Sequence, residues 1–386
     1  MTDWLVVGAG VAGSVVSARL AAAGAIVTVV DAGPATVTGD DLFAALAVTD
    51  RVRSTPLVRR VEGGPLVPYT SGVGPGGGSA VNGSIMSMSG PFRHRHSIPF
   101  EVVERVVRST VNGHRVDTWA AYHGPSSLAM DRLVLSTPVE SLLVDSRRCV
   151  GVRTESGEEL FADRVVVCAG AIMTPTLLLR SAIGGPAVGV GLQDHPAVAL
   201  VHGVRSSLGS TGPSISTLER VGPIQIMHLR RLGPAGDDSS VSGLGATVVM
   251  LMRPESRGSV HLDHEGYPAV SFGIGSVDAD IERLSGGVSE ILGEGLAGDI
   301  VDAPRGDTVE DWVRERLATA VPVVTHAASG CAMGSVVDRF GRPDGVENLY
   351  VVDASIFPAV PSVNPMLPTV QLSETMVDRW LAAGFV

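Results

Sequence analysis

The sequence contains no lysine. All 29 basic residues of the 386-residue chain are arginines, and the 40 acidic residues outnumber them, which gives a formal net charge of −11. The absence of lysine excludes Schiff-base catalysis and a P-loop phosphate site, because both depend on the lysine ammonium group. The acidic balance argues against nucleic acid or an anionic membrane surface as a partner.

Cysteine and long apolar runs are also scarce. Three cysteines stand far apart at positions 149, 168 and 331, a pattern that fits buried thiols in a reducing compartment, not a disulfide framework or a zinc site. No apolar run reaches about 18 residues, the length that would cross a bilayer. The N-terminus lacks the basic segment of a signal peptide. We therefore expect a cytoplasmic protein with no membrane span.

The first 31 residues carry the clearest local pattern. Trp4–Val7 is an apolar run that leads into Gly8-x-Gly10-x-x-Gly13, a helix-like stretch and a second β-branched run that ends on Asp31. In such a strand–turn–helix–strand unit the glycines allow a tight turn, the approach of a pyrophosphate and close helix packing. The final acid lies where a carboxylate can accept from ribose hydroxyls. The pattern predicts a dinucleotide site without distinguishing FAD from NAD.

Two later segments also predict contact with the cofactor through glycine. Residues 72–78 contain five glycines, which expose backbone N–H groups to a flat or anionic ligand. Arg164–Cys168 reads as a buried strand that ends at Gly170, before a helix for which Thr174 is the expected N-cap and Pro175 the first residue. This repeats the strand–glycine–helix pattern of the N-terminus. A second stretch of backbone would then contact the same cofactor.

Residues 91–130 are expected to form a short connector. His94 and His96 form an H-x-H, which we interpret as a solvated basic turn because no third ligand is spaced nearby. No metal site is predicted. Residues 100–108 are expected to be helical.

Residues 201–323 change character and suggest a second lobe on the substrate side. Alternating apolar runs predict an antiparallel sheet, and two helices are expected near 278–292 and 309–318. We expect this α+β lobe to interrupt an α/β dinucleotide-binding domain, which comprises residues 1–200 and returns as 324–386.

The last sixty residues hold the candidate catalytic groups. His326 lies in a loop of small residues that leaves it accessible, although a lone histidine is more often a surface residue or a satisfied core residue. A strand ending in Asp353 then leads through a proline-rich loop to Asn364, and a closing helix is expected over 370–381.

Taken together, these motifs resemble the glucose–methanol–choline (GMC) family of flavin oxidoreductases. Eight segments match the family in order along nearly the whole chain: 8–13, 76–83, 170–184, 192–196, 253–258, 326–334, 352–358 and 364–365. The resemblance implies a Rossmann-like FAD-binding domain and an antiparallel-sheet substrate domain. The chain departs from the family after Asp31 and around 91–130, where it has fewer residues, so we expect a shortened cap. The resemblance also implies non-covalent FAD, because Val81 stands where members with tethered flavin carry histidine.

The resemblance implies a role for each site residue. Asp31 would bind the adenosine ribose, the Val139 backbone would meet the adenine, and Ser79 and Asn82 would lie near the pyrophosphate and isoalloxazine. Asp353 and Ala354 would lie along the other face of the flavin. The full cofactor set is Gly8, Gly10, Gly13, Asp31, Gly77, Ser79, Asn82, Val139, Gly170, Asp353, Ala354 and Pro365.

The chemistry that the resemblance implies is alcohol oxidation. His326 matches the histidine that takes the hydroxyl proton while a hydride moves to flavin N5, and Asn364 matches the second active-site position. An imidazole with an ordinary pKa near 6.5 suits this general base, and an amide can bond the oxygen without competing for the proton.

The short, lysine-free form resembles mycofactocin-associated members, which implies electron transfer to an acceptor other than oxygen. The substrate would be a small alcohol or a redox cofactor. Three alternatives remain: an oxidase that yields peroxide, a non-redox lyase, and an electron-relay subunit. Aromatic residues are only 4% of the chain, so a substrate cage of stacked rings is not expected.

Overall fold

A computed structural model gives the fold and describes residues 3–54, 56–86, 97–103, 106–124, 132–204, 213–233, 243–295, 299–304 and 308–386. The H-x-H turn at His94 and His96 lies outside the described residues. Among the described helices, none has the length and apolar content needed to cross a bilayer.

A five-stranded parallel sheet is the centre of the first lobe. Its order is β11-β2-β1-β15-β24, with strands Leu133–Val134, Val27–Val30, Trp4–Val7, Arg164–Val167 and Leu349–Val351. Every neighbouring pair is parallel. The strands are almost continuously apolar because both faces of the sheet are covered. The turns that follow β1, β2 and β15 therefore meet at one edge, where α/β sheets bind their ligands.

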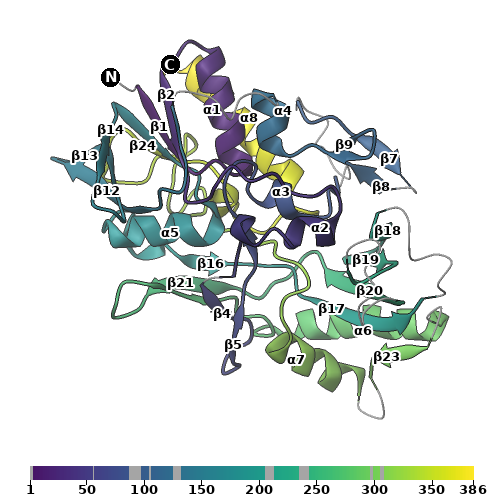
Figure 1. Ribbon diagram of the computed structural model, residues 1–386. Helices are drawn as coiled ribbons and strands as arrows, with labels where there is room; N and C mark the ends of the chain where they lie inside the picture. Colours follow the sequence, from purple (N-terminus) through teal and green to yellow (C-terminus); the bar gives the residue numbers. More distant parts are fainter. Residues whose placement is uncertain are drawn as a thin grey trace.

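Helices cover one face of this sheet, and a small sheet with a helix covers the other. Helices α1 (Val11–Ala22) and α8 (Met366–Ala382) lie side by side next to α4 (Thr118–His123) (Figure 1). The opposite face carries the antiparallel strands β12 (Val139–Asp145), β13 (Arg148–Thr154) and β14 (Glu159–Phe161), together with α5 (Gly170–Arg180). The rings of Trp4 and Trp380 stack in the core with their centroids 5.4 Å apart, and this contact packs the sheet against α8.

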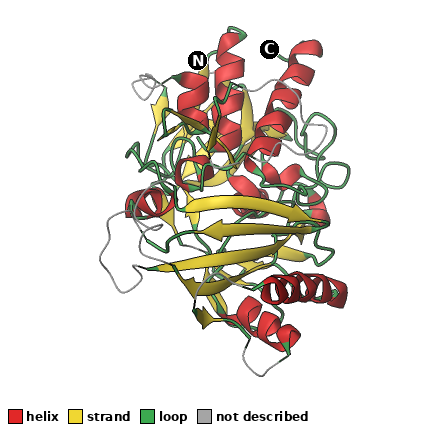
Figure 2. Cartoon of the chain, turned by 90° about the vertical axis from the view of Figure 1, so that its right-hand side faces the viewer, coloured by secondary structure: helices red, strands yellow, loops and turns green. Residues whose placement is uncertain are grey.

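The second lobe contains two sheets, where the sequence predicted one. The antiparallel sheet β18-β19-β20-β17-β23 consists of Ile215–Val221, Ile224–Leu229, Leu244–Leu251, Ala197–Gly203 and Ile300–Asp302. Helices α6 (Asp278–Glu294) and α7 (Val309–Thr319) flank it (Figure 2), which confirms both predicted helices. The other sheet, β16-β21-β22-β4-β5, consists of Val190–Leu192, Gly258–Leu262, Pro268–Ser271, Leu57–Arg59 and Leu66–Pro68. It is mixed, because β22 pairs with β4 in parallel.

Two local expectations are wrong. The described residues of the stretch 100–108 form the antiparallel strands β7 (Glu101–Val103) and β8 (Val106–Arg108), not a helix, because β-branched valines favour strand pairing. Helix α5 begins at Gly170, so Thr174 lies inside it and is not its N-cap. The short remaining elements are α2 (Leu42–Leu46), η1 (Thr49–Arg51), β3 (Val52–Arg53), β6 (Ser71–Gly72), α3 (Gly78–Val81), β9 (Thr110–Val111), β10 (His114–Arg115), η3 (Gly185–Ala187) and η4 (Ala354–Ile356).

Candidate active site

Two glycines of the first turn are required by the packing of the protein itself. Gly8 has a φ of +106°, and a Cβ on it would lie 2.5 Å from the carbonyl oxygen of Cys168. A Cβ on Gly13 would lie 1.8 Å from the Gly8 carbonyl oxygen. No side chain larger than hydrogen fits at either position. The start of α1 is therefore held directly against the ends of β1 and β15.

The two glycine-rich turns touch each other. Gly77 has a φ of +49°, and a Cβ on it would lie 2.8 Å from the Cα of Gly10. The Gly76 N–H also donates to the Ala9 carbonyl over 2.9 Å. Beside this contact, a Cβ on Gly78 would meet no atom within 4 Å. No side chain caps the N-terminus of α1, and its first turn has no acidic residue. Open space in front of an uncapped helix N-terminus fits the pyrophosphate of a dinucleotide.

Asp31 follows β2 and holds three backbone amides. Its Oδ2 accepts from the Ala9 N–H (2.7 Å), and its Oδ1 accepts from the N–H groups of Gly33 (2.7 Å) and Gly74 (2.8 Å). The carboxylate thus ties β2 to both glycine turns. Its predicted contact with the ribose stays a prediction.

Val139, which is predicted to contact the adenine, is the first residue of β12 and is tied to the region of Asp31. The N–H of Thr137 donates to the Asp31 carbonyl over 2.9 Å, and Val139, two residues later, pairs with Thr154 of β13. The backbone of Val139 is therefore held on the β2 side of the site.

Asp353 connects the start of α5 to η4. It is buried, and its carboxylate accepts from the Gly170 N–H (2.9 Å), the Thr174 hydroxyl (2.5 Å) and the Ser355 N–H (2.7 Å). Burial raises the pKa of this carboxyl group. The next residue, Ala354, accepts a hydrogen bond from the Ser329 N–H in the loop that carries His326.

Ser79 and Asn82 belong to internal networks around α3. The buried Ser79 hydroxyl accepts from the Thr118 N–H over 2.9 Å. The Asn82 amide oxygen accepts from the Arg115 guanidinium (2.9 Å), and its amide nitrogen lies 3.4 Å from the Met366 sulfur at the start of α8. Both side chains therefore connect the glycine-rich loop to neighbouring helices.

Two histidines meet at the expected catalytic position. The Nδ1 atoms of His326 and His195 are 2.9 Å apart, and their rings are nearly perpendicular at 85°. His195 is only 1% exposed, and its Nε2 lies 3.0 Å from the Pro361 carbonyl oxygen. Burial lowers the pKa of His326 to about 4, and burial together with the neighbouring ring holds the pKa of His195 well below its usual value.

A buried carboxylate fixes the backbone of both histidines. Asp194 Oδ1 accepts from the N–H groups of His195 and His326, each over 2.8 Å, and Oδ2 accepts from the Tyr69 hydroxyl over 2.8 Å. The Tyr69 oxygen accepts in turn from the Ala327 N–H over 3.0 Å. Burial raises the pKa of Asp194 to about 6. These bonds hold the loop of His326 from outside the two segments that the sequence predicted to be catalytic.

Asn364 lies in the second C-terminal loop. Its amide oxygen accepts from the Gln225 side chain of β19 over 3.2 Å, and Pro365 is the N-cap of α8. Pro361, in the same loop, accepts from His195, which contacts His326. The loops of the two predicted catalytic residues therefore meet at His195.

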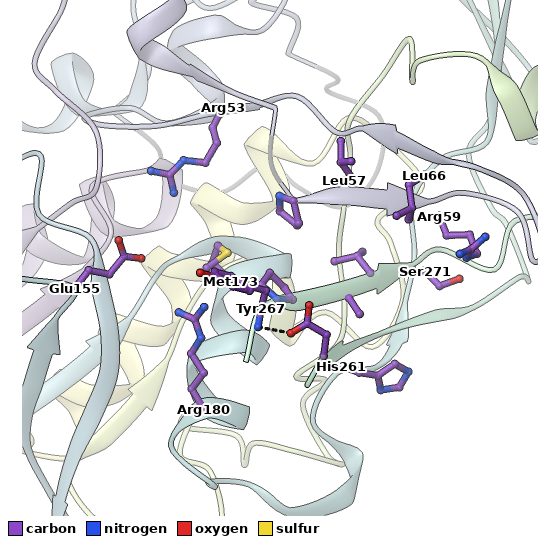
Figure 3. Close-up of a pocket in the computed structure, with 15 residues that line it drawn as sticks. Arg53, Leu57, Arg59, Leu66, Glu155, Met173, Arg180, His261, Tyr267 and Ser271 are labelled. Carbon is purple, nitrogen blue, oxygen red and sulfur yellow. Dashed lines mark hydrogen bonds between the residues drawn. The ribbon is translucent and has the colours of Figure 1, made fainter. Parts of the chain in front are cut away.

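A cavity of about 700 Å³ lies away from these histidines, between α5, the β4–β5 hairpin and β21–β22 (Figure 3). Arg53, Glu155 and Arg180 point into it, and none of the predicted catalytic or cofactor residues lines it. It is therefore separate from the His326–His195 site. Among the described residues, no group of three or more potential metal ligands is found.

A parallel sheet with two glycine turns at one edge is the architecture of a dinucleotide-binding domain. Two models of the GMC oxidoreductase family match the chain, over residues 102–197 and 254–373, more than half of it together. The chain belongs to the GMC oxidoreductase family. The family consists of flavoproteins, and its cofactor, FAD, is the cofactor of this chain.

Curated relatives are longer than the regions they share with this chain. An uncharacterized GMC-type oxidoreductase of Rhodococcus erythropolis is 28% identical over 70% of this chain and 61% of its own length. The 5-(hydroxymethyl)furfural oxidase of Methylovorus sp. is 30% identical over 63% and 56%, respectively. The chain thus spans about three fifths of the length of these relatives.

Solved structures share the fold over the whole chain. Pyridoxine 4-oxidase from Mesorbium loti superposes with a TM-score of 0.82, 18% identity and 99% coverage of both chains. Formate oxidase gives a TM-score of 0.81 with 18% identity, covering 99% of this chain and 98% of its own. These similarities establish the architecture.

Sequence reasoning placed His326 and Asn364 in the catalytic pair but missed the groups that hold them. His195 and Asp194 stood in a segment recognised only as part of the family resemblance, and Tyr69 was not singled out. The available signal was an adjacent Asp-His pair before a strand. Their partners become visible only when residues more than one hundred positions apart are brought together.

Proposed function

We propose that the chain oxidises an alcohol to a carbonyl compound, with His326 as the general base and FAD bound non-covalently. The observation that carries this proposal is the half-buried His326 imidazole, held in place by Asp194 and His195 at the ligand-binding edge of the sheet. Val81, which is buried on α3, offers no nucleophile for a covalent bond to the flavin.

The oxidation removes two groups from the substrate: the hydroxyl proton and the hydride on the adjacent carbon. FAD, when bound, supplies the acceptor for the hydride. His326 has a pKa of about 4, so it is neutral at pH 7 and has a lone pair for the proton. The Asn364 amide would bond the substrate oxygen as the carbonyl forms.

We further propose that the substrate is a small alcohol or a redox cofactor, and that the electrons pass to an acceptor other than oxygen, of the mycofactocin type. The resemblance of the lysine-free sequence and its glycine loop at 76–83 to that subfamily supports this assignment. A second candidate is an oxidase, which the names of the Methylovorus and Mesorbium proteins favour. Stopped-flow reoxidation in air separates the two, because peroxide formed at the rate of turnover would contradict the dehydrogenase.

Anaerobic titration of the FAD-loaded protein with a panel of alcohols tests the reaction itself. At least one alcohol should bleach the visible flavin band and yield its carbonyl product in equal amount. A lyase or a structural flavin predicts no bleaching by any alcohol. Bleaching that is unchanged in His326→Ala would support an electron-relay role and overturn the proposed base.

A further inference from the structure

His195 is a buried histidine whose two ring nitrogens each face a hydrogen-bond partner, and the Met252 backbone also hydrogen-bonds to the ring. Nε2 faces the Pro361 carbonyl oxygen at 3.0 Å, and Nδ1 faces Nδ1 of His326 at 2.9 Å. A carbonyl oxygen only accepts hydrogen bonds, so Nε2 of His195 must carry a hydrogen. Burial disfavours the imidazolium form, so this is the ring's one N–H. Nδ1 of His195 is therefore an acceptor.

The same reasoning assigns the hydrogen on His326. Two nitrogens 2.9 Å apart form a hydrogen bond only when one of them donates. Because Nδ1 of His195 is committed as the acceptor, Nδ1 of His326 must donate. A neutral His326 then has its lone pair on Nε2.

We infer that His195 is a positioning residue that fixes the tautomer of His326, so that Nε2 is the nitrogen that accepts the substrate proton. This inference rests on the proposed function. The hydroxyl proton moves to Nε2, and the bond from Nδ1 of His326 to His195 stays intact. FAD, when bound, would supply the acceptor for the hydride on the adjacent carbon.

The charged groups around His195 favour the neutral form of its ring. Asp194, the adjacent carboxylate, faces the backbone N–H groups of both histidines and the Tyr69 hydroxyl, not an imidazole nitrogen. The positive charge of Arg220 further lowers the pKa of His195. His326 is therefore oriented by the neutral ring of His195. This ring adds no negative charge, so the pKa of His326 stays low.

Two substitutions separate this role from simple packing. In His195→Gln the amide nitrogen replaces Nε2 and can still donate to Pro361, but the acceptor for His326 is lost. In His195→Asp a carboxylate oxygen replaces Nδ1, which restores the acceptor and places a negative charge beside the His326 ring. We expect flavin reduction to slow about 10- to 100-fold in the Gln variant, a part of the ~10²–10⁴ that a general base contributes. In the Asp variant the pH below which flavin reduction slows should rise by one unit or more, because the carboxylate raises the pKa of His326. If both variants lost the same factor in the rate of flavin reduction, and its pH dependence did not change, His195 would act through packing alone.

The direct test is the nitrogen NMR spectrum of the FAD-bound protein labelled with ¹⁵N-histidine, without substrate. The His326 signals, assigned by their absence in His326→Gln, should show a protonated Nδ1 and a bare Nε2 in the wild type. In His195→Gln this preference should be lost. A wild-type His326 with its hydrogen on Nε2 would overturn the inference. The spectrum requires no turnover, so it separates failure of this inference from failure of the proposed function, which the alcohol titration tests. If His195→Gln does not fold, the wild-type spectrum still decides.

Discussion

Replacing Asp353 by alanine should lower the free energy of unfolding by at least about 3 kcal/mol. The carboxylate accepts from the Gly170 N–H, the Thr174 hydroxyl and the Ser355 N–H at 2.5–2.9 Å. Each buried donor that loses its acceptor costs about 1–3 kcal/mol. We take the lower end for all three, because removing a buried carboxylate also recovers its desolvation penalty, which is visible in its raised pKa.

Denaturant unfolding of the FAD-bound protein measures this loss. The free energy of unfolding of Asp353→Asn should lie between those of the wild type and Asp353→Ala. Its amide oxygen still accepts a hydrogen bond, whereas its amide nitrogen faces a donor. Asp344→Ala is the matched control, because this side chain is exposed, and it should stay within about 0.5 kcal/mol of wild type. If Asp353→Ala also stayed in that range, these hydrogen bonds would not hold α5 and η4 together.

Three other results are expected. Because a protonated imidazole cannot accept a proton, flavin reduction should stay constant from pH 7 downward and fall only near pH 4, the pKa of His326; a limb near the ordinary 6.5 would contradict the effect of burial. Gly77→Ala should lower FAD occupancy at least tenfold in the ratio of flavin to protein absorbance, because its Cβ would lie 2.8 Å from Gly10; Gly63→Ala, also at positive φ but in open space, should retain FAD. Tyr69→Phe removes a bond to a buried carboxylate and should cost about 1–3 kcal/mol in denaturant unfolding, and an unchanged midpoint would argue against the network.

Local patterns predicted the elements whose signals lie within one short segment. The N-terminal strand–turn–helix–strand unit and the helices α6 and α7 are present, because their periodicity is a property of consecutive residues. The valine-rich stretch at 100–108 was misread as a helix, because a short apolar run does not distinguish the two periods when pairing decides the outcome.

Long-range pairing could not be predicted in the same way. The partner of β22 is β4, about two hundred residues earlier, so one predicted sheet became two. The same limit applies at the site. His326 stood out through its loop of small residues, whereas His195 and Asp194 gain their roles only from contacts across 131 and 132 positions of the chain.

The most direct test of the central claim is the anaerobic rate of flavin reduction in His326→Ala. With the best alcohol of the panel, the rate should fall about 10²- to 10⁴-fold at unchanged FAD content, because the base for the hydroxyl proton is gone. His264→Ala, which removes an exposed histidine, should keep the wild-type rate. A His326→Ala variant that is reduced within about twofold of wild type would contradict the assignment of His326 as the catalytic base.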